Sequence, residues 1–268
     1  MSVAVLCNLS DGLIIGVDSA VTISDASAIQ KVFEDGEKLF QLADKIGVAT
    51  FGLGGLEGRS IGSFIHEFEL TQEDIHSLSI QEVAERLRAF FMDVYIRFAE
   101  KIFGQPFDDI PGDQKGSLGL IVGGYSPKGF LSEAWEIQIP RNRDPNSARM
   151  ICGPGTFLVA WFATSGPIER YLHGFDHGLL GEVGTFVEDI LQRPFTPEEI
   201  SRFTPIREKY GYSIPVDYMP IPTGIEYVRF LVRLVIQHYR FTSTHPVVGG
   251  RERIGLVTYK EAKFRILE

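Results

Sequence analysis

Ser2 is the first residue whose chemistry depends on its place in the chain. Initiator methionine is usually removed when the second residue is small, so we expect Met1 to be cleaved and Ser2 to carry both a hydroxyl and a free α-amine. An α-amine has an ordinary pKa of about 7.7–8.0, so it can accept the proton of its own hydroxyl near neutral pH. Such a pair also needs a nearby cation, and a carboxylate to fix that cation. Ser2 is therefore a candidate N-terminal nucleophile.

The residues that follow Ser2 have the pattern of a buried hairpin. Residues 2–9 are almost continuously apolar and β-prone, Asp11-Gly12 is a strong tight-turn signal, and residues 13–17 are again apolar. A second pair of strands is expected over residues 38–42 and 46–52. Continuously apolar strands are typical of sheets that are buried on both faces, so we expect this block in the middle of a layered protein.

The rest of the chain is predicted to contain blocks of helices between blocks of strands. Helices are expected over residues 57–70, 79–102 (opened by a capping box of Ser79 and Glu82), 156–173 and 223–238, and strands over residues 118–125, 130–139, 148–152, 253–259 and 263–267. Paired helices between strand blocks favour an α+β fold, a four-layer αββα sandwich of two antiparallel sheets. A doubly wound parallel sheet would need strands and helices to alternate one by one.

Three stretches near the N-terminus resemble a known family. In residues 12–22 a hairpin ends in an acidic residue and a threonine follows four positions later; residues 37–42 resemble a strand that carries a catalytic lysine; residues 47–52 resemble a strand that ends in an oxyanion-binding glycine. Counting back from Asp18 without a gap places the nucleophile on Ser2. In these features the chain resembles the proteasome β-type subunits, which are N-terminal-nucleophile (Ntn) hydrolases, near the bacterial proteasome homologues.

That resemblance implies the Ntn-hydrolase fold, amide-bond hydrolysis and a role for each matching residue. Ser2 would be the nucleophile with its α-amine as the base, Lys38 would lower the effective pKa of the hydroxyl, and Asp18 would keep Lys38 charged. The N–H of Gly52 would stabilise the oxyanion, a contribution of about 3 kcal/mol. Thr22 would bind the backbone of a substrate that adds as a strand.

The apolar neighbours of Lys38 give independent support for its pairing. A buried lysine is costly unless it is paired, and Asp18 is the partner that the resemblance supplies. Lys31 remains a competing candidate for the cation.

The chain also departs from the family at two places. Gly153-Pro154-Gly155 has a proline where the family has a serine, in a turn before its third helix, and His245 and Val248 stand where the family has Asp-x-x-Ser. Those groups assist the N-terminal amine, so a catalytically inactive, proteasome-like subunit with a structural or assembly role is the main alternative. Amide hydrolysis of a small non-peptide substrate also stays open, because the fold serves several acyl-transfer chemistries.

The resemblance covers residues 2–175 and 218–268. We therefore predict a single domain over residues 1–268, with an insertion at about residues 176–217. Because family members assemble into rings, the resemblance also implies a homo-oligomeric ring, a peptide or unfolded-protein substrate and a possible ATPase partner.

Composition limits the other classes of function. The net charge of −9 argues against nucleic acid as a partner. No apolar run reaches the length of a membrane helix, and no signal peptide is visible, so we expect a cytoplasmic protein that does not enter a membrane. Cys7 and Cys152 are expected to be buried free thiols. His173 and His177 lack a convincing third ligand, so neither a metal nor another cofactor is expected.

Overall fold

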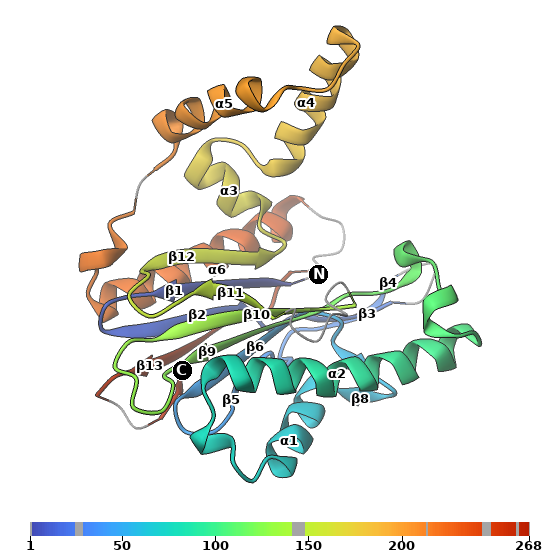
Figure 1. Cartoon of the computed structure of the whole chain (residues 1–268), viewed down its shortest axis with the longest axis vertical. Coiled ribbons are helices and arrows are strands. Elements are labelled where there is room, and N and C mark those ends of the chain that lie inside the picture. The colour runs from blue at the N-terminus through green and yellow to red at the C-terminus, as the bar shows by residue number, and fades with distance from the viewer. Residues whose placement is uncertain are drawn as a thin grey trace.

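Two five-stranded antiparallel sheets lie face to face in the computed structural model, which describes residues 2–24, 29–140, 148–212, 214–242, 248–260 and 263–267 (Figure 1). The first sheet has the order β12-β1-β2-β13-β14, with β1 (Val3–Asn8), β2 (Gly12–Asp18), β12 (Leu158–Ala163), β13 (Glu252–Thr258) and β14 (Arg265–Leu267). The second has the order β11-β10-β9-β6-β5, with β5 (Leu39–Gln41), β6 (Ile46–Gly52), β9 (Leu118–Gly124), β10 (Glu133–Ile139) and β11 (Arg149–Cys152).

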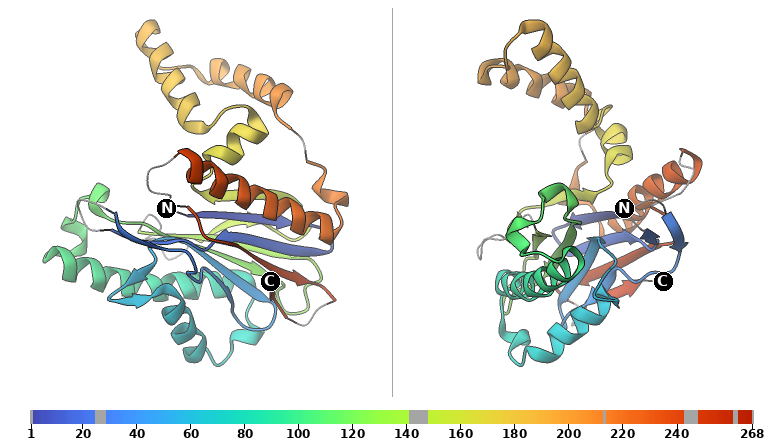
Figure 2. Two further views of the ribbon diagram at one scale, coloured as in Figure 1. Left: turned by 180° about the vertical axis from the view of Figure 1, so that it is seen from behind. Right: turned by 90° about the vertical axis from the view of Figure 1, so that its right-hand side faces the viewer.

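Helices cover the outer face of each sheet. Helix α2 (Ile80–Phe103) packs on β9 and β10 with α1 (Ile61–Thr71) beside it, and α6 (Ile221–Thr242) packs on β1, β2 and β13 with α3 (Gly166–His173) beside it (Figures 1 and 2). The apolar core accordingly has one part between the sheets and one part under each helical layer. The predicted four-layer αββα sandwich is confirmed.

The remaining elements are short. Two small hairpins are formed by β3 (Val21–Ser24) with β4 (Ile29–Phe33), and by β7 (Gly55–Leu56) with β8 (Arg59–Ser60). Single 3₁₀ turns are η1 (Ile75–Ser77), η2 (Phe107–Asp109), η3 (Gly112–Gln114) and η4 (Val216–Tyr218). The first predicted helix is therefore shorter than expected, because β7 and β8 precede it and the side chain of Ser60 caps its N-terminus at Ile61.

Local sequence explains why the central elements form. Every residue of β1 and β2 is buried, as the continuous apolar pattern predicts. Gly16 lets α6 approach β2, since a Cβ atom there would lie 2.4 Å from Cγ1 of Val228. The capping box of Ser79 and Glu82 opens α2, and Gly104 closes it in the left-handed conformation.

The helix predicted over residues 156–173 is wrong in its first half. Residues 158–163 form β12, which pairs with β1 over six positions from Val3 opposite Ala163 to Asn8 opposite Leu158. A six-residue apolar run fits either a strand or a buried helix, and here pairing with β1 decides the outcome. Helix α3 begins only at Gly166, where Pro167 in the first turn is typical of a helix start.

Residues 176–217 were expected to be an insertion. Ile214 and Val216 pack against the apolar core of the body, whereas residues 177–210 form a helical arm. It contains α4 (His177–Leu191) and α5 (Pro197–Tyr210), and it stands away from the layered body at the top of Figures 1 and 2. Whether arm and body are one domain stays a prediction. No helix in the described part of the chain has the length and apolarity needed to cross a membrane.

The two cysteines are free and buried. Burial raises the pKa of Cys7 to about 12 and that of Cys152 to about 11. Because the thiolate is the reactive form, we expect the folded protein to resist iodoacetamide near pH 8, whereas the protein unfolded in guanidinium should take up one adduct per cysteine. Mass spectrometry of both samples measures this, and rapid labelling of the folded protein would contradict it.

Candidate active site

Ser2, Asp18 and Lys38 meet at one end of the first sheet. The Nζ of Lys38 lies 3.0 Å from the Oγ of Ser2 and 2.9 Å from Oδ1 of Asp18, and it donates a hydrogen bond to each. All three residues are buried, with exposed fractions of 3%, 0% and 6% in chain order. Three residues far apart in the sequence thus form a chain of contacts in which a hydroxyl oxygen and a carboxylate share one ammonium group.

Backbone groups hold the carboxylate of Asp18 in place. Asp18 ends β2, where its Oδ1 also accepts a hydrogen bond from the N–H of Val3 at 3.0 Å. Its Oδ2 accepts one from the N–H of Gly249 at 3.2 Å. These hydrogen bonds fix the carboxylate in position, so Asp18 can serve as the counter-ion of Lys38.

The segment that carries Lys38 is fixed by Ser19 and Thr50. The carbonyl of Ser19 accepts a hydrogen bond from Gly36 N–H at 2.7 Å, and its hydroxyl donates to the carbonyl of Glu34. The carbonyl of Lys38 accepts from the N–H of Thr50 in β6 at 2.8 Å. These contacts place Lys38 between the two sheets. Sequence reasoning missed Ser19 as a positioning residue, although it directly follows Asp18.

Burial and the neighbouring charge of Asp18 shift the pKa of Lys38 in opposite directions. Loss of hydration lowers the pKa of the ammonium group, whereas the charge of Asp18 and its hydrogen bond raise it, and the net pKa lies below the ordinary value of 10.5. The lysine is therefore an ammonium group that gives up its proton more readily than a surface lysine.

The lowered pKa of Lys38 predicts a pH dependence of stability. Between the folded-state pKa and the ordinary value of 10.5, the unfolded protein binds more protons at this position than the folded protein does. The free energy of unfolding of the wild type, relative to Lys38→Met, should therefore increase as pH rises through that window. Urea unfolding of both proteins from about pH 7 to about pH 10 measures the difference. A difference that is flat or falls with pH would contradict the prediction.

A cavity of about 420 Å³ opens beside Ser2. Ser2 lines it together with Phe51, Gly52, Gln138, Ala163 and Thr164, among others. Gly52 ends β6 with φ of +86°, and a Cβ atom there would lie 2.2 Å from the carbonyl oxygen of Ser117, so only glycine fits this turn without strain. The position thus brings the predicted oxyanion-binding glycine to the same cavity as Ser2.

Thr164 is a site residue that the sequence analysis missed. Its N–H donates to the carbonyl of Ser2 at 2.9 Å, and the residue lines the cavity. It lies between β12 and α3, a boundary that was concealed when residues 156–173 were interpreted as one helix. The signal that marks it is Ser165-Gly166-Pro167, a typical helix start after a β-prone run.

Two other predicted residues lie elsewhere. Thr22 belongs to β3, opposite Val32 of β4, and it is not among the residues that line the Ser2 cavity. Its Oγ1 is buried and has no hydrogen-bond partner among the described residues. Lys31 is exposed, with its Nζ 4.5 Å above the ring of Phe33, so Lys38 and not Lys31 is the cation beside Asp18.

The structure also shows where the residues that depart from the family pattern lie. Gly153-Pro154-Gly155 precedes the strand β12 rather than a helix, and Thr156, which ends the turn, binds Asn8 at the far end of β1 from Ser2. Pro154 therefore lies away from Ser2. Val248 is buried, and His245 lies outside the described residues.

A carboxylate network follows directly after Thr164. Ser165 donates to Oε1 of Glu169 at 2.7 Å, and both the N–H and Nδ1 of His177 lie 2.9 Å from Oε2 of Glu169. Glu169 is buried, which by itself raises its pKa, but these hydrogen bonds prevail and hold the pKa below its ordinary value. His173 ends α3 and His177 begins α4, so the two do not share a helix face. No group of three or more metal-ligating side chains occurs among the described residues.

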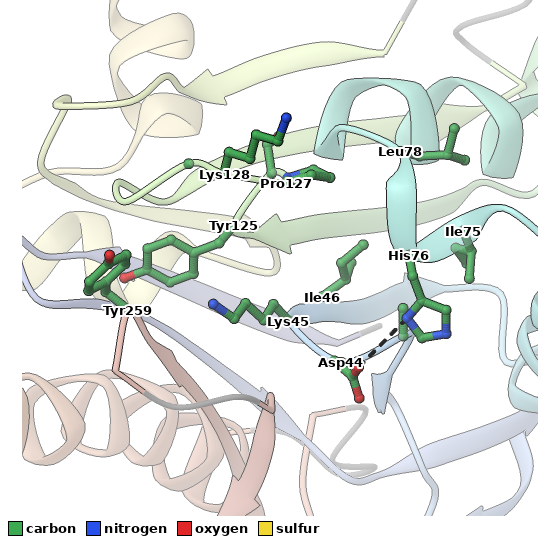
Figure 3. Close-up of a pocket in the computed structure, with 13 residues that line it drawn as sticks. Asp44, Lys45, Ile46, Ile75, His76, Leu78, Tyr125, Pro127, Lys128 and Tyr259 are labelled. Carbon is green, nitrogen blue, oxygen red and sulfur yellow. Dashed lines mark ion pairs between the residues drawn. The ribbon is translucent and has the colours of Figure 1, made fainter.

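A second cavity of about 490 Å³ lies at the opposite end of β6 (Figure 3). Lys45 lines it beside the adjacent rings of Tyr125 and Tyr259, with its Nζ 6.0 and 5.8 Å from the two ring centroids, and Nδ1 of His76 lies 3.7 Å from Oδ2 of Asp44. Ile46 lines this cavity and Gly52 lines the other, so about 20 Å of strand separates them. The second cavity therefore shares no wall with the Ser2 site.

Comparison with known proteins supports the fold, but it supports neither a family nor an activity. No family model matches the chain, and no curated protein matches its sequence. Among solved structures, the chain is similar to Anbu (ancestral beta-subunit) from Yersinia bercovieri, with a TM-score of 0.55 and 14% identity, over 98% of this chain and 86% of that chain. The fold is the Ntn-hydrolase fold and is proteasome-like.

The prediction that the chain is a proteasome β-type subunit near the bacterial homologues is wrong. It depended on short motifs in the first 55 residues, and the absence of any matching family model, with 14% identity to the structural neighbour, overturns it. A fold does not fix a family, and motifs this short do not decide membership.

Proposed function

We propose that this chain is an N-terminal-nucleophile peptidase, in which Ser2 attacks an amide carbonyl after Met1 has been removed. The observation that carries the proposal is the position of Lys38, whose Nζ lies 3.0 Å from the Oγ of Ser2 and 2.9 Å from Asp18. Burying a lysine costs stability, and an apolar residue of similar size would pack better at this position. A buried lysine that donates to a hydroxyl beside a cavity is therefore better explained by a chemical role.

The reaction proceeds in two halves. The Oγ of Ser2 forms a bond to the carbonyl carbon of the substrate, and its proton passes to the α-amine of the same residue. Lys38 stabilises the developing charge on Oγ, and Asp18 keeps Lys38 oriented. The carbon–nitrogen bond then breaks, the leaving amine takes the proton, and an ester remains on Ser2. Water hydrolyses this ester and restores the free hydroxyl.

The cavity supports an extended peptide as the substrate. Its lining includes Gly52 at the end of β6 and Thr164 at the β12–α3 junction, together with Ser2. Phe51 and Ala163 supply apolar surface for a substrate side chain, and Gln138 adds a polar amide. The N–H of Gly52 is proposed as the oxyanion donor.

The inactive-subunit alternative was based on Pro154, His245 and Val248. Pro154 lies at the far end of β1, and the lysine–carboxylate pair is complete, which favours the peptidase. Val248 is buried next to Gly249, which binds Asp18, and this departure still favours the alternative. Hydrolysis of a small amide uses the same chemistry and differs only in how the cavity is filled.

Removal of Met1 provides the test. Intact mass spectrometry should show a loss of about 131 Da, and a serine-directed phosphonate or β-lactone should add once, on Ser2, only to chains that lack Met1. Fluorogenic peptides and small aryl amides then separate the two substrate classes. A processed protein that forms no adduct and cleaves neither substrate would refute the proposal.

A further inference from the structure

Strand β10 carries two polar residues on the face that meets the first sheet. Successive side chains of a strand point to opposite faces, so Ala134, Glu136 and Gln138 share one face and residues 135, 137 and 139 share the other. Residues 135, 137 and 139 belong to the core under α2, whereas Ala134 belongs to the core between the two sheets. An inward face of this kind is normally apolar, so two polar residues in succession on it need an explanation.

Glu136 is buried at the centre of a small polar network. Its side chain is 4% exposed, and its Oε2 accepts hydrogen bonds from Nε of Arg149 at 2.9 Å and from a second nitrogen of the same guanidinium. Its Oε1 accepts a hydrogen bond from Nε2 of Gln138 at 2.7 Å. A buried ion pair adds little to stability compared with well-packed apolar residues. The network is therefore better explained by the group that it holds in place.

The group that Glu136 holds in place is the side-chain amide of Gln138. A carboxylate that pairs with a guanidinium can only accept hydrogen bonds, so the nitrogen end of the amide must face Glu136 and the oxygen is the other end. A primary amide has two N–H donors and an oxygen with two lone pairs, which is more than the bond to Glu136 uses. Gln138 is thus an oriented group with both donor and acceptor capacity.

Gln138 lies in the wall of the Ser2 cavity, in one row with an aromatic ring. Phe51, Gly119 and Gln138 are direct partners across β6, β9 and β10, and all three line the cavity. A Cβ atom at Gly119 would lie 2.0 Å from Cε2 of Phe51, so the ring extends over the glycine towards Gln138. None of the described residues that line the cavity is charged. The wall therefore offers an apolar ring beside an oriented amide.

We propose that Gln138 selects substrates with a carboxamide side chain, asparagine or glutamine, next to the amide bond that Ser2 cleaves. A carboxamide both donates and accepts, so it and Gln138 can each donate to the oxygen of the other, while its methylene groups pack on Phe51. A carboxylate only accepts, and an apolar side chain does neither. Gln138 determines the specificity, and Glu136 is its positioning residue. This inference rests on the proposed function and names the substrate class of the same site.

Matched fluorescence-quenched peptides measure the selectivity. Two series carry glutamine, methionine or glutamate at one position, directly before the cleaved bond in the first series and directly after it in the second. Methionine resembles glutamine in length but lacks its hydrogen-bonding groups. In one of the two series, kcat/KM should be at least about 10-fold higher for glutamine than for methionine, and the glutamate peptide should be the slowest.

Three variants connect the selectivity to the network. Gln138→Met should remove the preference for glutamine while the methionine peptide is still cleaved, and Glu136→Gln should weaken the preference because the amide is no longer oriented by a charge. Gln41→Met is the matched control: Gln41 is an exposed residue of β5 that does not line the cavity, so the full preference should be kept. Unchanged thermal unfolding of each variant shows that the fold is kept. Equal kcat/KM for glutamine and methionine in both series, or a preference that survives Gln138→Met, overturns the inference.

A binding measurement separates this inference from the proposed function. In NMR spectra of isotope-labelled Ser2→Ala protein, the side-chain amide signals of Gln138 are identified by their absence from Ser2→Ala/Gln138→Met. Titration with N-acetylglutamine methylamide should shift these signals to saturation, whereas N-acetylmethionine methylamide should not. Such shifts without any peptide cleavage by the wild type would refute the peptidase and keep the carboxamide site. Cleavage without such shifts would overturn the carboxamide site and keep the peptidase.

Discussion

Replacing Ser2 by alanine is expected to reduce amide hydrolysis at least about 10³-fold, because the oxygen that forms the covalent bond is lost. The substitution removes the acceptor of one Lys38 hydrogen bond but leaves Asp18 paired, so the fold should be kept. Turnover of a fluorogenic peptide, together with adduct formation by a serine-directed reagent, measures the loss.

Ser10→Ala is the matched control for this experiment. Ser10 is exposed in the turn after β1, at the opposite end of the strand from Ser2. Its loss should leave both turnover and labelling at the wild-type level. If Ser2→Ala retains wild-type turnover while Met1 is removed, the nucleophile lies elsewhere and the proposed function fails.

The second large effect is expected at the buried ion pair. Asp18→Ala leaves the ammonium group of Lys38 buried without its counter-ion and removes an acceptor from Val3 and Gly249. Breaking a buried pair by removing one partner costs about 3–5 kcal/mol, so this variant should unfold at much lower urea concentration. Lys38→Met should be far less destabilising, because Asp18 keeps its two backbone donors, yet it should lower turnover about 10²–10⁴-fold.

The double variant Asp18→Ala/Lys38→Met separates charge burial from packing. It should recover about 2 kcal/mol or more of the stability that Asp18→Ala loses, since the uncompensated ammonium group is gone. Asp11→Ala, in the exposed turn of the same hairpin, should change stability by less than about 0.5 kcal/mol. Strictly additive losses at positions 18 and 38 would contradict a direct coupling between the two side chains.

The layers could be predicted because the local signals agree with the final packing. Residues 2–9 and 13–17 are apolar on both faces and become central strands, and the capping box at Ser79 opens the long helix that covers the second sheet. The edge strand β12 could not be predicted by periodicity, because its six residues gain their conformation by pairing with β1.

The side-chain part of the candidate site could also be predicted. The tight turn at Asp11-Gly12 fixes the hairpin register, so Asp18 must return to the start of β1 beside Ser2. The backbone donor at Gly249 could not be found, because a peptide N–H has no residue type that marks it, and the donor at Thr164 was missed because residues 156–173 were interpreted as one helix. The catalytic roles of these residues remain predictions, and the assignment to a family from the same motifs was wrong.

The anchoring of Ser2 determines how the protein must be produced for any assay. The carbonyl of Ser2 is bound by the N–H of Thr164, and the N–H of Val3 is bound by Asp18, so the start of β1 is held on both sides of this peptide bond. An affinity tag joined to Ser2 would replace its α-amine by a peptide bond. Under the proposed function such a protein would be inactive whatever the untagged chain does, so its lack of activity would not test the proposal. A purification handle belongs after β14, at the outer edge of the first sheet.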